Sequence, residues 1–210
     1  MTANTTQLSL YNAALRHLGE RKLASLSDAT EPRRYLDDEY PDTVLLCLRA
    51  GDWNFAIRSV QMDASGVVTP QFGYQSAFEK PADWLRTVVL SPSETFRPPL
   101  RDYQDQSGYW IANLQTLYAR YVSATLGMNL ALWPPDFAEY VGAALARTIA
   151  LRITASDDKF EKAEQREKKY RTRAIATDAM DQAADAMPSG TWVTSRAARG
   201  TTTSASIKTW

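Results

Sequence analysis

The sequence predicts an α+β protein, mainly α: a four-helix bundle with an inserted small antiparallel β meander and an extended C-terminal tail. Two observations lead to this class. Apolar residues recur every three to four positions before residue 52 and again after residue 135, as in helices. Between these two regions they recur at every second position, as in strands. The last segment shows neither period. Because strands interrupt helices in this order, we expect helices over 1–52, a β-rich insertion over 53–132, helices over 133–187 and an extended arm over 188–210.

The composition favours a globular protein of balanced charge. Of the 210 residues, 44% are hydrophobic, which is enough for a sizeable core. The 24 basic and 24 acidic residues balance, so no net charge draws the chain to DNA or to an anionic membrane. With one cysteine, the chain forms no internal disulfide and no cysteine-based zinc site. The sequence shows no signal-peptide pattern and no apolar run of about 18 residues, so we expect a soluble protein made in the cytoplasm.

Helical spacing predicts two helices before residue 52. Thr5 or Thr6 can cap the first helix, which runs to about Gly19, a residue type that ends helices well. Its apolar stripe is Tyr11, Ala14, Leu15 and Leu18. The second helix runs to Gly51, and Pro41 inside it should kink the helix or divide it in two. Its apolar stripe is Leu36, Tyr40, Val44, Cys47 and Leu48.

The apolar period changes to two at Trp53, where Trp53, Phe55 and Ile57 occupy alternate positions. Further strand-like stretches are 72–79, 85–90, 109–113 and 117–122. Turn-forming pairs separate the stretches: Ser65-Gly66, Pro98-Pro99 and Ser107-Gly108. Short strands at such spacing predict one antiparallel meander, although the stretch 81–85 can instead form a short helical turn.

Helix returns after the two prolines at 134 and 135. The stretch 136–155 is apolar on nearly all sides, which predicts a position at the centre of the bundle. Ser156 then caps a long charged helix that runs to about Ala186. In three places along this helix an acidic residue lies four positions before a basic residue, a spacing that stabilises helices. The pairs are Asp158–Lys162, Glu164–Lys168 and Glu167–Arg171.

Residues 188–210 differ in kind from the rest. They are rich in Thr, Ser, Gly and Ala, have no helical period and carry no acidic side chain. Alone, such a segment is expected to be disordered. Large apolar side chains in it are costly to leave in water and are good interface anchors, which favours a docking arm over a frayed end. The candidate arm residues are Trp192, Arg196, Arg199, Ile207, Lys208 and Trp210.

No catalytic, cofactor-binding or metal-binding constellation is predicted, and the chain carries no phosphate-binding loop or hydrolase motif. His17, the single histidine, lies beside an apolar helical stripe, so we expect it to pack or cap. Cys47 falls on a buried stripe, where a reactive thiol lacks access. The adjacent acids Asp37-Asp38 and Asp157-Asp158 do not point to one place on a helix. We therefore expect a protein that is not an enzyme and uses no cofactor.

Five stretches of sequence, taken in order, match those of a known family. They are YNAALRHLG at 11–19, LSD at 26–28 before RRYL at 33–36, RAGDWNF at 49–55, PADWL at 81–85 and WPPDF at 133–137. Their order and spacing resemble the tail tubular protein A family, the head-to-tail adaptors of short-tailed bacteriophages. The resemblance covers about residues 8–186, and the basic C-terminal arm departs from the family pattern.

The resemblance implies a structural virion protein at the head–tail junction, in a ring of twelve copies beneath the portal protein. The tail nozzle or tail tube protein attaches below the ring. Double-stranded DNA passes through a central channel during genome ejection, without specific binding. The helices are then expected to contact the portal and neighbouring copies, and the β insertion to face the tail. No membrane contact is implied.

Two other functions remain open from the residues alone. Carboxylates distant in sequence can meet across a cleft, as in a tail-associated peptidoglycan hydrolase. Tyrosines between residues 103 and 121, interleaved with Arg101 and Arg120, can stack on bases in a nucleic-acid-binding module. Strand aromatics more often form cross-strand core pairs, and the balanced charge argues against nucleic-acid binding.

Overall fold

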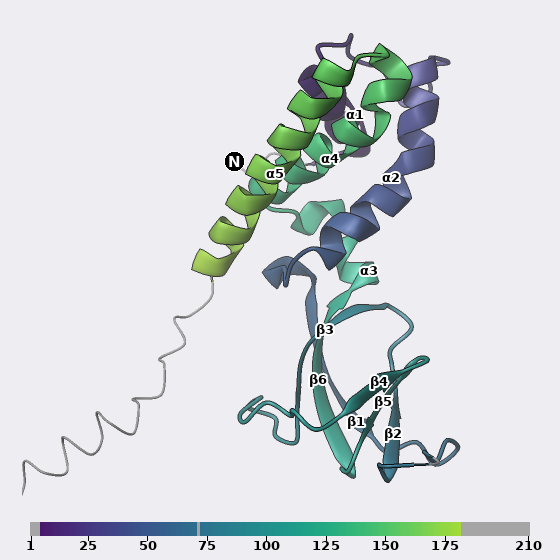
Figure 1. Cartoon of the computed structure of the whole chain (residues 1–210), viewed down its shortest axis with the longest axis vertical. Helices are drawn as coiled ribbons and strands as arrows, with labels where there is room; N and C mark the ends of the chain where they lie inside the picture. The colour runs from purple at the N-terminus through teal and green to yellow at the C-terminus, as the bar shows by residue number, and fades with distance from the viewer. Residues whose placement is uncertain (1–4, 71, 182–210) are drawn as a thin grey trace, which may run out of the picture.

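The computed structural model describes residues 5–70 and 72–181, and the arm predicted over 188–210 lies outside them. The described chain is elongated, with helices at one end and strands at the other (Figure 1). Its helices are α1 (Gln7–Leu18), α2 (Glu31–Arg49), α3 (Ala124–Gly127), α4 (Pro135–Thr154) and α5 (Asp157–Met180), with the short 3₁₀ helices η1 (Asn54–Ala56) and η2 (Leu130–Leu132). Its strands are β1 (Ile57–Asp63), β2 (Ser76–Glu79), β3 (Trp84–Ser91), β4 (Gln104–Gln106), β5 (Tyr109–Ala112) and β6 (Thr116–Ser123).

The predicted four-helix bundle with one inserted meander is wrong, although the fold is α+β. The described residues form five α-helices and two three-stranded antiparallel sheets, in the strand orders β1-β6-β3 and β2-β5-β4. In the first sheet β6 is central, and its Val122 lies opposite Ile57 of β1 and Arg86 of β3. Of the pairs formed by the described strands, β4–β5 alone joins consecutive strands, so the topology is not a meander.

The helix α4 is the centre of the helical end. Ten of its residues are buried, as its all-round apolar sequence predicted, and α1, α2 and α5 all pack against it. Figure 1 shows α5 and α2 on opposite flanks, with α1 and α4 between them. Neither α4 nor any other described helix combines the length and apolarity needed to cross a bilayer. Cross-helix contacts show that α2 and α5 both run antiparallel to α4: Arg173–Asp136, Arg147–Glu167, Arg152–Glu39 and Cys47–Tyr140.

Capping residues mark the helix ends as predicted. The Thr6 hydroxyl accepts the Ser9 backbone N–H at the start of α1, and Gly19 ends that helix in the left-handed conformation, with φ of 74°. The Ser156 hydroxyl likewise accepts the Lys159 N–H at the start of α5. In contrast, α2 continues through Pro41 as one helix instead of dividing. Burial of its apolar stripe against α4 compensates for the backbone hydrogen bond that proline cannot donate.

The strand predicted from Trp53 is wrong over its first four residues. Trp53 and Phe55 lie in the helical core, where both rings sit 4.8 Å from the Phe137 ring between centroids. The Trp53 indole N–H also donates to the Cys47 carbonyl at 3.0 Å. The 3₁₀ helix η1 turns these side chains inward, and strand pairing starts only at Ile57. Tertiary packing of the aromatic rings therefore outweighs the local two-residue period.

The β end has a hydrophobic core of its own between the two sheets. Its buried members are Phe78, Leu90, Trp110, Ala112, Leu117 and Ala119. Two indole N–H groups converge on the Thr87 hydroxyl, from Trp84 at 3.1 Å and from Trp110 at 3.0 Å, so both large rings are held by hydrogen bonds. The short strand β4 escaped sequence prediction because its three residues are polar and exposed.

Candidate interaction surfaces

The single histidine and the single cysteine are packing residues. The His17 Nε2 lies 3.6 Å from a Glu139 carboxylate oxygen, and its ring centroid lies 5.5 Å from that of Tyr170. Burial lowers the pKa of His17, against the opposing pull of Glu139. Burial also raises the pKa of the Cys47 thiol to about 12, so this thiol stays protonated at neutral pH. Both side chains therefore have the packing role that their positions predicted.

One acid of each adjacent pair singled out from the sequence is bound in local structure. Asp37 pairs with Arg33 and accepts the Tyr11 hydroxyl at 2.8 Å, which ties α2 to α1. Asp158 pairs with Lys162 at 2.7 Å along α5, as predicted. Among the described residues, no group of three or more His, Cys, Asp or Glu side chains is placed to hold a metal ion.

The other two predicted ion pairs of α5 differ in outcome. Glu164 and Lys168 pair at 3.1 Å, as the four-residue spacing predicted. Glu167, however, pairs across helices with Arg147 of α4 instead of with Arg171. This contact turns the Glu167 face of α5 toward α4 and leaves the opposite face of the helix outward.

Asp83 joins three strands and the start of α3, a role that the sequence reasoning missed. Its carboxylate accepts the Ser123 hydroxyl at 2.5 Å and the Tyr121 hydroxyl at 2.9 Å, both from β6. Arg58 of β1 also donates to it at 3.3 Å. Burial alone would raise the pKa of Asp83, but these hydrogen bonds and the Arg58 charge outweigh it and hold the pKa below 3.8.

The stretch around Asp83 is a turn followed by a strand, not a short helix. The Trp84 N–H donates to the Pro81 carbonyl at 2.9 Å, and β3 begins at Trp84. The Asp83 carbonyl accepts the Ala124 N–H at 2.7 Å, where β6 gives way to α3. The only sequence signal for this role was the PADWL stretch at 81–85.

A second set of contacts fixes how the β end projects from the helices. The Asn54 backbone N–H donates to the Asp178 carboxylate at 3.0 Å, and its side-chain amide donates to the Asp178 carbonyl at 2.7 Å. Arg86 of β3 pairs with Asp52 at 3.2 Å. Burial raises the pKa of Asp178. The last turns of α5 are therefore held against the segment that leads into β1.

The aromatic residues of the strands are mainly core residues. Tyr121 is buried and its hydroxyl is bound to Asp83, while Trp110 is buried in the β core. The Arg120 guanidinium lies over the Phe96 ring, 4.3 Å from its centroid. Tyr121 and Trp110 are therefore not available to stack on bases, whereas Tyr103, Tyr109 and Tyr118 are half-buried.

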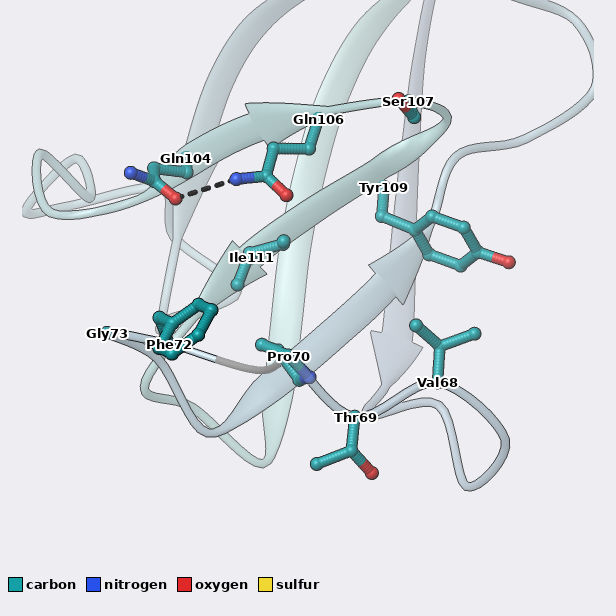
Figure 2. Close-up of a pocket in the computed structure, with 10 residues that line it drawn as sticks. All are labelled: Val68, Thr69, Pro70, Phe72, Gly73, Gln104, Gln106, Ser107, Tyr109 and Ile111. Atoms are coloured by element: carbon teal, nitrogen blue, oxygen red, sulfur yellow. Dashed lines mark hydrogen bonds between the residues drawn. The ribbon is translucent and has the colours of Figure 1, made fainter.

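A groove of about 620 Å³ lies at the β end, between the loop after β1 and the β4–β5 hairpin (Figure 2). Its lining contains no Asp, Glu, Lys or Arg side chain. On the hairpin side of the groove, the Gln106 side-chain amide donates to the Gln104 side chain of the same strand, β4, at 2.9 Å. Tyr109 and Ile111 come from β5, the strand paired with β4 (Figure 2). Phe72, on the loop, is 86% exposed. An uncharged groove beside a large exposed ring suits contact with a protein segment better than with an ion.

The six residues predicted to form the docking arm lie outside the described part of the chain: Trp192, Arg196, Arg199, Ile207, Lys208 and Trp210. No protein-family model matches the chain, and no curated protein matches its sequence. Two kinds of surface on the described residues remain as candidates for contact with partners. These are the uncharged groove at the β end and the charged outer faces of α2 and α5 at the helical end.

Proposed function

We propose that this chain is a structural virion protein of a bacteriophage, a head-to-tail adaptor that forms a ring between the portal protein and the tail nozzle or tail tube. The main support is that the elongated chain has a helical end and a β end, and that these two ends have different surfaces (Figure 1). Charged helices form one end, and an uncharged groove with the exposed Phe72 lies at the other. Such a division suits a protein that joins two different partners.

The β end is the side proposed to face the tail. It has its own hydrophobic core, so its loops can be presented to a partner without disturbing the helices. Phe72 lines the groove and is 86% exposed on the loop after β1. A large exposed apolar side chain beside a groove supports a protein contact there, because leaving it in water is unfavourable.

The helical end is the side proposed to contact the portal and neighbouring copies. Because α4 is buried at the centre, the outer faces of the surrounding helices are left for partners. Twelve copies in a ring then enclose a channel for double-stranded DNA. The balanced charge of the chain supports passage without specific binding, because phosphate contacts with cations dominate DNA affinity.

The arm over 188–210 is proposed to clamp the portal. A segment that orders only on docking binds modestly by itself. Twelve arms on one symmetric partner bind together, and the shared attachment raises the overall affinity by orders of magnitude. Deleting 188–210 is expected to leave the thermal melt nearly unchanged and to weaken portal attachment; a collapsed melt would place this segment in the folded core.

Electron microscopy of the protein mixed with the portal protein of the same phage tests the proposal. We expect a twelvefold ring of this protein on the portal, with an open axial channel. Portal particles that stay bare at saturating protein concentration contradict the proposal. The protein without the portal is not a sufficient sample, because ring formation can depend on docking.

A further inference from the structure

A stripe of four cations runs along one face of α5. Lys162, Arg166, Lys169 and Arg173 follow one another at steps of four, three and four residues, so they share one side of the helix. All four are exposed, and the side chains of Lys162 and Arg173 are 61% and 67% exposed. The acid within this stretch that turns inward is Glu167, which pairs with Arg147 of α4. We call these four residues the basic stripe.

A stripe of acids lies on the outer face of α2. Glu31, Asp38 and Asp42 are spaced by seven and four residues and are all exposed. Arg34 lies at its edge, so three acids stand against one base. Within the described residues, Asp38 and Asp42 form no ion pair. We call Glu31, Asp38 and Asp42 the acidic stripe.

The two stripes have matching lengths and lie on opposite flanks. Each runs over eleven residue steps, from 162 to 173 and from 31 to 42, or about 16 Å of helix. Figure 1 shows α5 and α2 on opposite sides of α4, and both run antiparallel to α4. They are therefore parallel to each other. The acidic stripe lies on the outer face of α2, whereas the basic stripe lies on an exposed side of α5, where Arg166 donates to the His17 carbonyl of α1 and Arg173 pairs with Asp136 of α4.

We infer that the basic stripe of one copy binds the acidic stripe of the next copy around the ring. This contact rests on the proposed adaptor function, and it identifies the surfaces through which the copies meet. Because the stripes lie on opposite flanks, two copies can form only one contact between a basic and an acidic stripe. A dimer would therefore leave one basic stripe and one acidic stripe without a partner. Such a head-to-tail contact repeats from copy to copy, and it gives a ring when the rotation between neighbouring copies closes, as the proposed seat on a symmetric portal requires.

The contact also determines how neighbouring copies are shifted. Arg173, at one end of the basic stripe, pairs with Asp136 at the start of α4. The acidic stripe lies nearer the other end of α4, where Glu39 pairs with Arg152. Matching the stripes therefore requires neighbouring copies to be staggered along the helix axes. In a closed ring this stagger means that the helices are tilted from the ring axis.

A second copy explains the stripes better than a nucleic acid does. DNA would be bound by the basic stripe but leaves the acidic stripe without a partner, whereas one copy-to-copy contact uses both. Exposed ion pairs each contribute little, and their strength falls with added salt. A weak contact of this kind agrees with copies that assemble on a portal, where many such contacts act together.

Charge reversal on each stripe tests the contact. One variant carries Lys162→Glu and Lys169→Glu. A second carries Glu31→Lys and Asp38→Lys, the acids that face these two lysines when the parallel stripes are matched end to end, and a third carries all four changes. The matched control carries Arg21→Glu and Lys22→Glu, two exposed cations in the loop after α1. Each protein is melted to confirm folding. Ring occupancy on the portal is then counted by electron microscopy, and self-association is followed by sedimentation at low and high salt.

We expect each two-residue variant to require roughly tenfold or more protein for the same ring occupancy, because two attractions become repulsions. The four-residue variant should regain rings, since its stripes are complementary again, and the control should match the wild type. Rings that form equally in all variants overturn the contact and leave the adaptor function standing. A four-residue variant that folds but forms no rings also overturns the contact and leaves the adaptor function standing.

Two other results separate the contact from the function. A basic-stripe variant that forms normal rings but loses binding to duplex DNA overturns the copy-to-copy contact and assigns the stripe to DNA. Wild-type protein that forms neither rings on the portal nor any salt-sensitive association overturns both proposals. Association that the stripe variants abolish, without any binding to the portal, supports the contact and overturns the adaptor function alone.

Discussion

Gly142 of α4 lies directly against Ala13 of α1. A β-carbon at position 142 would stand 3.0 Å from the Ala13 β-carbon and 3.9 Å from the Leu10 carbonyl oxygen. The two helices therefore approach this closely because position 142 has no side chain. This crossing sets the position of α1 on α4, the helix against which α2 and α5 also pack.

Gly142→Val should destabilise the protein by about 1–3 kcal/mol, because three added carbons must be accommodated between α1 and α4. Chemical denaturation measures the change. Gly66→Val is the control, since no atom lies within 4 Å of the place that its β-carbon would take. Combining Gly142→Val with Ala13→Gly should cost less than the sum of the two single changes. Additive costs would show that the two positions are not coupled.

Asp83→Ala should destabilise the protein by about 1–3 kcal/mol, because the buried Tyr121 hydroxyl loses its acceptor. Ser123 loses the same acceptor. Urea unfolding measures the change. The matched control is Asp102→Ala, which removes an exposed carboxylate that accepts the Tyr74 hydroxyl at 2.7 Å, and it should change stability by no more than about 0.5 kcal/mol. Equal losses from the two variants would rule out a special role for Asp83.

Stability should fall as the pH drops below about 6.5, partly because of His17. Its pKa is lowered in the folded protein by burial, so the unfolded chain binds the proton more readily. The neutral form that stabilises the fold is fully present above the ordinary value of 6.5, and the stabilisation is lost as the pH falls toward the lower, folded pKa. For one proton, the slope is at most about 1.4 kcal/mol per pH unit.

His17→Gln removes this titration, so its unfolding free energy should vary less than that of the wild type between about pH 5 and pH 7. Denaturant titrations at several pH values measure both. Glu139→Gln is the second variant. The Glu139 charge raises the pKa of His17, so removing this charge should lower that pKa further. This variant should steepen the loss of stability at low pH. Identical pH profiles for all three proteins would show that His17 does not titrate in this range.

Phe72→Asp should weaken attachment of the tail nozzle or tail tube protein by roughly tenfold or more, because a large exposed ring beside a groove is a typical interface anchor. The unfolding free energy should stay within about 0.5 kcal/mol of wild type, since the side chain is exposed. Val67→Asp is the control, on the same loop but outside the groove lining. If both variants bind the tail protein as the wild type does, the groove is not the tail contact.

The four long helices were predictable because their signals are local, whereas the short helix α3 was not predicted. The predicted stretch 136–155 became α4 at Pro135–Thr154, and Thr6, Gly19 and Ser156 cap the helices as expected. A helical period depends on neighbours three and four positions away, and a cap on one or two residues, so both can be read directly. Pro41 shows the limit, because its local signal allowed either a kink or a break, and α2 continues through it as one helix that packs against α4.

The sheets were not predictable in the same way because their partners are distant in sequence. The central strand β6 pairs with β1 and β3, and a period of two contains no information on that choice. Trp53 also followed a strand period yet packs with Phe137, more than eighty positions later in the chain. The role of Asp83 was missed for the same reason, since its partners Tyr121 and Ser123 lie on another strand.

The sequence by itself determined the four long helices α1, α2, α4 and α5, the balanced charge and the inward faces of α1, α2 and α4, because hydrophobic periodicity and capping act within a few residues. Tertiary structure decided the two sheets, the groove beside Phe72 and the exposure of the basic and acidic stripes. The spacing of Lys162 and Lys169 is visible in the sequence, but their side of α5 is set by contacts such as Glu167 with Arg147. Such contacts depend on which distant segments meet, and local chemistry alone does not specify that.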